Sequence, residues 1–147
     1  MRSVVLRIGI IGAIVIGAII LRPFIMGNAG SLQVGDCFDP PTVAGETVDD
    51  VQHHPCTESH GAEVVFVGNY SPATNTYPGD AEFSAFFQNT CTTAFNTYTG
   101  IDFATDTLYD MAAFTPTSDG WAKNDRKVIC YAVRLDDAKM TQSIRKT

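Results

Sequence analysis

Basic residues are scarce in this 147-residue chain, and no Lys or Arg lies between Pro23 and Ala122. Thirteen Asp and Glu residues fall in that stretch, and from Asn28 onward seven basic residues face sixteen acidic ones. An acidic surface repels phosphate backbones, so we expect no nucleic acid partner. Charged residues make up 18% of the chain and hydrophobic residues 45%. That balance excludes an intrinsically disordered protein, and the length fits one domain.

The common enzyme motifs are also missing. The chain has no GxSxG nucleophile elbow, no glycine-rich phosphate loop and no CxxC pair. Ser59 lies next to His60, but neighbours in sequence are not thereby positioned as a catalytic triad. We therefore expect no enzymatic activity and no cofactor.

The N-terminal segment is strongly hydrophobic. Residues 8–21 are apolar or glycine without a single charge. The longer run over residues 4–25 would make roughly 33 Å of helix, which spans a hydrocarbon core of about 30 Å. We therefore predict a transmembrane anchor over residues 1–27, followed by a short linker over residues 28–31.

The charges around this segment predict its orientation. Arg2 and Arg7 precede the span, so the positive-inside rule predicts a single-pass protein of the cell membrane. Its N-terminus would be cytoplasmic and its C-terminal domain extracytoplasmic. The alternative is a cleaved signal peptide, because Gly27 and Ala29 fit a small-x-small cleavage pattern. Cleavage after Ala29 would release a soluble, secreted binder.

Small residues recur along one face of the predicted anchor helix. Gly9, Ala13 and Gly17 follow at every fourth position, which lets a second membrane helix approach closely. Gly and Ala are also common in such segments without a partner. We expect the lipid bilayer and membrane proteins as partners, the latter through this helix face and the acidic outer domain.

The four cysteines all lie in the predicted outer domain. An even number in an exported domain predicts two disulfides. Of the three pairings, Cys37–Cys56 with Cys91–Cys130 is the most local. In the chain-entropy model each such cross-link contributes roughly 3–4 kcal/mol.

Residue patterns predict an α+β fold, in which one long helix packs across a small antiparallel sheet. We expect strands over residues 32–38, 48–54, 62–68 and 108–114, and a hairpin that pairs 121–123 with 127–135, a central strand. The helix would begin with Asp80 as N-cap and end at Gly100. The folded domain would span residues 32–135, and the polar tail over 136–147 would be frayed or weakly helical.

Four segments of this domain occur in a recognisable order. They are LQVGDCF at 32–38; Pro55, Cys56, His60 and EVV at 63–65; YPG at 77–79 leading to Cys91 and YTG at 98–100; and Pro116, Trp121, Asp125, Arg126 and Cys130. Together they resemble the septum-formation domain family of actinobacterial envelope proteins, over roughly residues 31–134. One departure is Asn124, which stands where that family usually has Gly. The resemblance implies an anchored extracytoplasmic domain linked to septum formation, without a defined enzymatic activity.

Histidines and acids gather in one short stretch that holds His53, His54, Glu58, His60 and Glu63. His60 and Glu63 precede a predicted strand, and in an extended chain their side chains would point to opposite faces. We assign both to structural hydrogen bonds in the turn after Cys56. The alternative is a metal- or small-ligand-binding envelope enzyme that recruits further ligands, such as Asp36 or His54.

The predicted hairpin turn contains Asp125 and Arg126. One interpretation is a solvated turn, and the other is that Arg126 pairs bidentately with a buried acid, Glu63 or Asp36. The sole tryptophan, Trp121, is expected to anchor the core beside a disulfide, and the alternative is an exposed binding hot spot.

Our leading hypothesis is a non-enzymatic interaction module that serves as an accessory subunit of a larger cell-envelope membrane complex. A division complex follows from the family resemblance. A respiratory or transport complex is equally compatible with the residues.

Overall fold

The computed structural model describes residues 27–42, 48–72 and 75–147. The predicted anchor over 1–27, apart from Gly27, lies outside the described residues, and so does its helix face of Gly9, Ala13 and Gly17. No helix in the described ranges is both long and apolar enough to cross a membrane.

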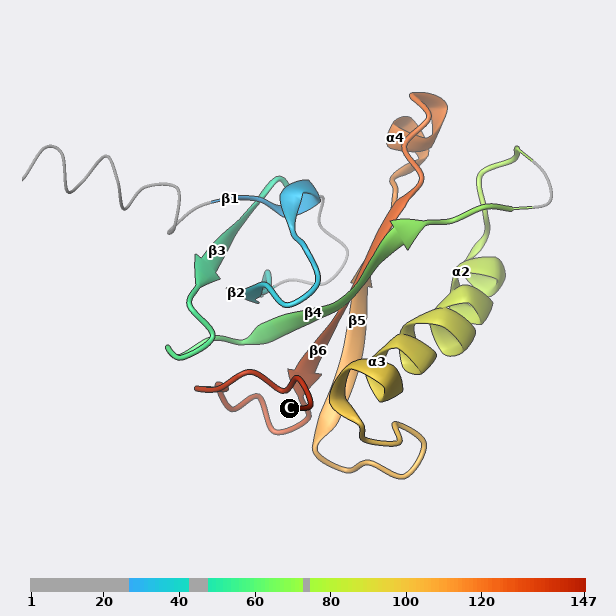
Figure 1. The fold of residues 1–147 in the computed structure, drawn as a ribbon. Helices are drawn as coiled ribbons and strands as arrows, with labels where there is room; N and C mark the ends of the chain where they lie inside the picture. The colour runs from blue at the N-terminus through green and yellow to red at the C-terminus, as the bar shows by residue number, and fades with distance from the viewer. Residues whose placement is uncertain (1–26, 43–47, 73–74) are drawn as a thin grey trace, which may run out of the picture.

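A six-stranded antiparallel sheet forms the centre of the domain, in the order β1-β3-β2-β4-β6-β5 (Figure 1). The strands are β1 (Gly27–Asn28), β2 (Cys37–Asp39), β3 (Asp50–His54), β4 (Ala62–Asn69), β5 (Tyr109–Phe114) and β6 (Lys127–Arg134). The two longest strands, β4 and β6, are rich in β-branched and aromatic residues and pair with each other. Because β6 also pairs with β5, the prediction of a central strand there is confirmed.

One long helical segment lies across one face of the sheet, as the sequence predicts (Figure 1). It consists of α2 (Asp80–Phe86), the π-helical turn η2 (Phe87–Cys91) and α3 (Thr92–Thr99). Gly79, not Asp80, occupies the N-cap position, so that prediction is wrong by one residue. Asp80 then lies in the first turn, where the helix dipole favours an acid. The helix ends at Gly100, whose φ of 75° is in the left-handed region that glycine adopts freely.

The chain before β2 turns instead of extending. We expected a strand over residues 32–38, but η1 (Ala29–Ser31) is a short 3-10 helix and β2 begins only at Cys37. Gly35 has a φ of 96°, and the Asp36 carboxylate accepts a hydrogen bond from the Gln33 amide at 2.8 Å. These two features close a turn that shortens the strand.

The predicted hairpin around Asn124 is wrong on its first arm. Residues Ser118–Ala122 form a short helix, α4, in place of a strand. Thr117 caps α4, because its side-chain oxygen accepts a hydrogen bond from the Gly120 amide at 3.0 Å. Asn124 follows with a φ of 69°, a conformation that Asn tolerates better than most residues.

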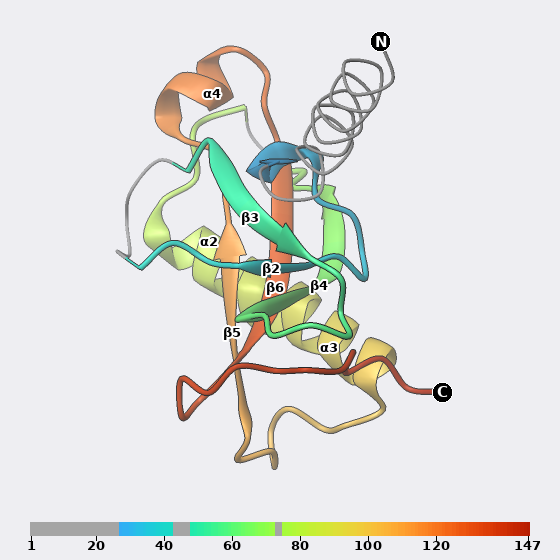
Figure 2. The same ribbon diagram turned by 90° about the vertical axis from the view of Figure 1, so that its left-hand side faces the viewer.

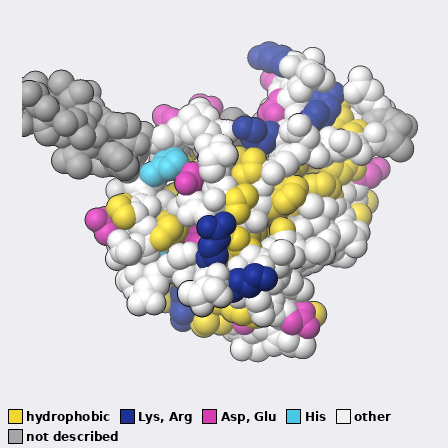
Figure 3. Space-filling view, in the orientation of Figure 1, with side chains coloured by type: hydrophobic (Ala, Val, Ile, Leu, Met, Phe, Trp, Pro, Cys, Tyr) yellow, Lys and Arg dark blue, Asp and Glu magenta, His cyan; other side chains and the backbone are white. Residues whose placement is uncertain are grey.

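Two hydrophobic clusters lie on the two faces of the sheet. The first lies between the helical segment and the sheet, with Phe95, Cys91 and Cys130 at its centre. The second lies beneath β2 and β3, which curl over β6 in Figure 2, and contains Phe38 and Tyr131 with ring centroids 5.2 Å apart. The helix leaves a band of hydrophobic side chains visible on the face shown in Figure 3.

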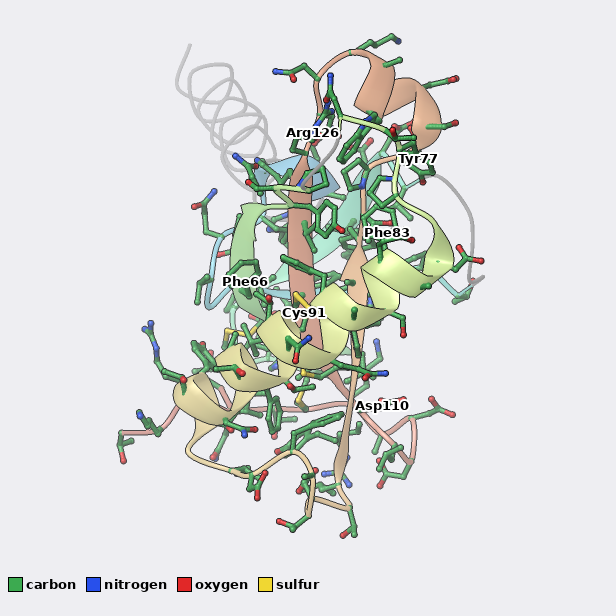
Figure 4. All side chains as sticks on the ribbon, turned by 90° about the vertical axis from the view of Figure 1, so that its right-hand side faces the viewer. Phe66, Tyr77, Phe83, Cys91, Asp110 and Arg126 are labelled. Atoms are coloured by element: carbon green, nitrogen blue, oxygen red, sulfur yellow. A yellow bond between two sulfur atoms is a disulfide. The ribbon has the colours of Figure 1, made fainter. Side chains whose placement is uncertain are left out.

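Both predicted disulfides are present. Cys37–Cys56 joins β2 to the loop after β3, and Cys91–Cys130 joins the helical segment to β6. Figure 4 shows Cys91 on the helical segment, where this segment passes over the sheet. The α+β architecture with two disulfides is therefore confirmed.

Arg126 pairs with neither Glu63 nor Asp36, so the second interpretation of this turn, an ion pair with a buried acid, is wrong. Its guanidinium carbon lies 3.5 Å from the ring centroid of Trp121, and it donates hydrogen bonds to the Trp121 carbonyl at 2.8 Å and to the Asn75 amide oxygen at 2.9 Å. Trp121 itself is 5% exposed and donates to the Asn75 carbonyl at 3.1 Å. Arg126 therefore ties α4 to the loop before α2, near Tyr77 in Figure 4.

We predict that Arg126→Ala lowers the free energy of unfolding by about 2 kcal/mol, because it removes a cation–π contact and three hydrogen bonds, the third of them to the Asp125 carbonyl. Urea denaturation followed by the fluorescence of Trp121 measures this loss. The matched control is Arg134→Ala, which removes only a surface pair with the exposed Asp136 and should leave the unfolding midpoint almost unchanged. Equal midpoints for wild type and Arg126→Ala would contradict the assignment.

Candidate functional site

The registry of β2 and β4 brings Cys37 and Glu63 side by side. The two residues are cross-strand partners, so their side chains point to the same face of the sheet. Cys37 is 2% exposed and Glu63 is 0% exposed. A glutamate without any solvent contact is unusual, because a carboxylate loses its hydration on burial and needs hydrogen-bond donors in exchange.

Three donors reach the Glu63 carboxylate from distant parts of the chain. The Tyr98 hydroxyl, on α3, donates to Oε1 at 2.5 Å, and the Ser143 hydroxyl donates to the same oxygen at 2.6 Å. The Ile144 amide donates to Oε2 at 2.8 Å. Hydrogen bonds to an ionised acceptor are about twice as strong as neutral ones, so this set joins strand, helix and C-terminal segment firmly.

Burial affects the titration of Tyr98 as well. Loss of solvent around its ring, followed by the hydrogen bond to Glu63, raises the pKa of Tyr98 from 10.0 to about 12. The phenol therefore remains a donor to Glu63 throughout the neutral range.

His60 lies beside the carboxylate and is also 0% exposed. Its Nδ1 lies 2.7 Å from the Glu58 carbonyl oxygen, which can only accept, so Nδ1 carries the proton. In the neutral ring Nε2 is then a bare acceptor, and it has no hydrogen-bond partner within the described ranges. Buried polar atoms without a hydrogen-bond partner are rare, so His60 Nε2 is a candidate atom for binding a ligand.

The structure brings His60 and Glu63 together, contrary to the expectation that they face opposite ways. A ring nitrogen of His60, a carboxylate oxygen of Glu63 and Sγ of Cys37 all lie within 4.8 Å of one another. The expectation fails because β4 begins only at Ala62, after a bend at Gly61, so strand alternation does not extend back to His60. We call Cys37, His60, Glu63, Tyr98 and Ser143 the Glu63 cluster.

The other proposed ligands lie outside this cluster. His54 Nε2 is 3.1 Å from Asp39 Oδ2, and Asp36 is engaged by the Gln33 amide. The structural role assigned to His60 in its turn agrees with its bond to Glu58. Glu63 bonds to the helix and the C-terminal segment instead of the turn. Sequence reasoning missed Tyr98 and Ser143 as its partners, because no local signal links positions so far apart.

The C-terminal segment is neither frayed nor helical, so that prediction is wrong. Met140 is 6% exposed and exchanges two main-chain hydrogen bonds with His60, at 2.8 and 2.9 Å. Lys139 forms an ion pair with Asp39, and the Lys146 amide donates to the Tyr98 carbonyl at 3.0 Å. Figure 2 shows this segment crossing the lower edge of the domain. We call residues 139–146 the tail strap.

The tail strap also changes the titration of Asp39. Burial by itself would raise the pKa of this carboxyl, but hydrogen bonds and charge from Lys139 and His54 outweigh it and lower the pKa. Asp39 therefore stays ionised and holds the start of the strap against β2.

A second feature is an open groove of about 830 Å³ beside strand β5. Since β5 is the last strand in the sheet order, its outer edge has no strand neighbour within the described residues. We call this feature the edge groove, and its lining includes Asn28, Gly30, Ala112, Phe114, Lys127 and Tyr131. Burial raises the pKa of Tyr131 to about 12, so its hydroxyl is uncharged at neutral pH.

These features define a small α+β domain with two disulfides, a cluster of side chains around the fully buried Glu63 carboxylate, and an open groove. Comparison with known protein families identifies it further: the chain belongs to the septum formation family, which it matches over residues 34–147. The family resemblance read from the sequence is therefore confirmed, and the match includes the tail strap. No curated protein and no solved structure matches the chain in the same comparisons.

We predict that Tyr98→Phe lowers the free energy of unfolding by about 2 kcal/mol, since it removes one donor to a buried charge. Chemical denaturation at pH 7 measures the loss. Tyr109→Phe is the matched control, because Tyr109 packs on Phe95 in the same core and no hydrogen bond of its hydroxyl is found among the described residues. A smaller loss in Tyr98→Phe than in the control would contradict the role of Tyr98.

The same variant has a pH signature. Unfolded Tyr98 ionises near pH 10, whereas folded Tyr98 remains protonated up to about pH 12. Its contribution to stability is therefore complete below pH 10 and is lost as the pH rises toward 12. Wild type should lose stability more steeply than Tyr98→Phe in this window, and parallel curves would count against the assigned pKa.

Proposed function

We propose that the protein is a non-enzymatic, membrane-anchored extracytoplasmic interaction module. In this proposal it acts as an accessory subunit of a membrane complex concerned with septum formation. Family membership supports the link to septum formation, and the apolar run over residues 8–21 supports the anchor. The edge groove is the observation that carries the docking role.

The edge groove has the properties of a strand-addition site. Ala112, Ala113 and Phe114 line it consecutively, and residues of the neighbouring strand β6 line it too, so the groove lies over the sheet face next to the edge strand. An edge strand offers unpaired main-chain groups to an extended segment of another protein, and neighbouring pockets select that segment's side chains. Phe114 and Tyr131, with ring centroids 4.9 Å apart, provide an aromatic floor of the kind found at binding hot spots.

The groove also lies close to the N-terminal end of the described chain. Its lining includes Asn28, Ala29 and Gly30, directly after β1 begins at Gly27. If residues 1–27 anchor the domain, the groove opens near the membrane surface, within reach of the outer segments of neighbouring membrane proteins. This placement favours a membrane protein as the partner.

The polar groups of the groove already serve the fold. Lys127 Nζ donates to the Gly30 carbonyl at 2.7 Å, Asp125 Oδ1 accepts from the Lys127 amide at 3.0 Å, and Thr117 caps α4. Groups engaged in this way are better suited to shape a surface than to transfer protons or attack a substrate. The His60 and Glu63 side chains, considered above as an enzyme site, are completely buried and do not touch solvent. Both facts favour recognition over catalysis.

The test is a pull-down of the tagged full-length chain from membranes solubilised in mild detergent. We expect wild type to retain a membrane complex and Ala112→Arg to lose it, because a long charged side chain fills the groove. Ala85→Arg is the matched control: it makes the same substitution at an exposed position of α2 and should retain the complex. Recovery of wild type as a monomer alone, or equal recovery of partners with both variants, would defeat the proposal.

A further inference from the structure

We propose that Cys37, His60 and Glu63 bind one divalent transition-metal ion, such as zinc, when the Cys37–Cys56 disulfide is reduced. The inference concerns the buried cluster and not the edge groove. It is therefore independent of the docking role, and either proposal can fail without the other.

The spacing of the three ligand atoms suits such an ion. They lie within 4.8 Å of one another on β2, on β4 and in the bend that precedes β4. In tetrahedral zinc sites with bonds of about 2.0–2.3 Å, ligand atoms are about 3.3–3.8 Å apart. The ligand atoms would have to move about 1 Å closer together, by rotation of their side chains, to reach these separations. The disulfide would no longer hold the Cys37 sulfur once it is reduced.

The free hydrogen-bonding capacity in the cluster consists of acceptors. His60 Nε2 has a lone pair and no partner within the described ranges. Glu63 Oε1 accepts from Tyr98 and Ser143, whereas Oε2 accepts only from the Ile144 amide and keeps one position free. Both residues are fully buried, and each has a ligand atom within 4.8 Å of the Cys37 sulfur. A cation would satisfy free acceptors in this position, whereas a further hydrogen-bond acceptor would not.

The charges agree with a divalent ion. The three groups that bond Glu63 are neutral donors, and no Lys, Arg or His forms an ion pair with it in the described part of the chain. A reduced Cys37 would add a thiolate as ligand. One carboxylate and one thiolate carry two negative charges, which neutralise one divalent cation. The neutral imidazole is the third ligand. Soft thiolate with imidazole selects zinc or its neighbours over magnesium or calcium.

The hydrogen bond on the far side of the imidazole favours the same role. Nδ1–H donates to the Glu58 carbonyl, which fixes the tautomer that leaves Nε2 free. Metal-binding histidines usually hold their second nitrogen in this way, because the contact orients the ring and increases its basicity.

Reduction of the disulfide can begin at Cys56. Cys56 is partly exposed, whereas Cys37 is 2% exposed, so a thiolate of a dithiol reductant reaches Cys56 Sγ first. Attack there forms a mixed disulfide and releases Cys37 as a thiolate; the second thiol of the reductant then displaces Cys56 and closes its own disulfide. The reductant gives up two electrons and two protons. Cys56 takes one proton, and the other goes to water when the metal binds the Cys37 thiolate.

The second disulfide provides an internal comparison. Cys91 and Cys130 are both 0% exposed and lie among Phe95, Tyr98 and Met111. In the described ranges the only group of ligating side chains close enough to hold an ion is the one at Cys37. A thiol freed at Cys130 should therefore bind no metal.

The experiment titrates Co²⁺ into the purified full-length chain carrying Cys56→Ser, which frees Cys37 and keeps the other disulfide. We expect about one equivalent of bound Co²⁺ with a thiolate-to-metal charge-transfer band, displaced by Zn²⁺. Adding His60→Ala should weaken binding by about 100-fold or more, since one of three ligands is lost. Cys91→Ser, which frees Cys130 in the same manner, should give no such band.

A second measurement uses the wild-type sequence. After reduction with a phosphine, Zn²⁺ should slow re-formation of the Cys37–Cys56 disulfide and leave that of Cys91–Cys130 unchanged, because metal and disulfide compete for one sulfur. Co²⁺ binding without the band, binding that survives His60→Ala, or equal re-oxidation with and without Zn²⁺ would overturn the proposal. So would loss of the folded state, by circular dichroism, in both Cys56→Ser and reduced wild type with Zn²⁺ present.

Discussion

A buried carboxylate determines how the parts of this domain are joined. Glu63 lies on a central strand without solvent contact, and its charge is tolerable there only because three donors replace water. One donor comes from the long helix and two from the tail strap. If any one of these donors moved away, the buried carboxylate would lose a hydrogen bond that no water replaces. Helix, strand and C-terminal segment are therefore coupled more tightly than the apolar contacts of the strap alone would allow. The Cys37–Cys56 disulfide lies against the same group and fixes β2 beside it.

This arrangement separates the molecule into two regions with different chemistry. The Glu63 cluster is centred on the fully buried Glu63 and His60 and is rich in acceptors, which suits a structural junction and, as proposed, a metal ion after reduction. The edge groove is open, and main chain from β5 and from the Asn28 to Gly30 segment borders it, which suits an extended segment of a partner. The chain belongs to the septum formation family, and only the proposed anchor would place the groove near a membrane surface. The two proposals therefore concern different parts of the molecule, one buried and one open to solvent.

Sequence reasoning succeeded where local pattern determines structure. The β-branched runs of β4 and β6 predicted the central strands, and helical spacing from Phe83 to Tyr98 predicted the helix that carries Cys91. With Cys130 on a central strand beneath that helix, the most local disulfide pairing followed. Sequence reasoning failed where contacts between residues far apart in the sequence determine the local structure. The tail strap is largely polar, and it is contacts with residues far away in the sequence, such as Glu63, His60 and Asp39, that order it. The first arm of the expected hairpin became α4 because the Thr117 cap favours a helical turn.

The measurement that tests the central claim most directly is hydrogen exchange of the Ile144 main-chain amide. Among the described residues, the hydrogen bond that this amide donates is the one to Glu63 Oε2, and the strap forms no regular helix or strand there. If Glu63 joins the strap to the core, this amide exchanges only when the domain unfolds, with an opening free energy close to that of central amides on β6. Exchange at the rate of an unstructured chain, while β6 remains protected, would contradict the account.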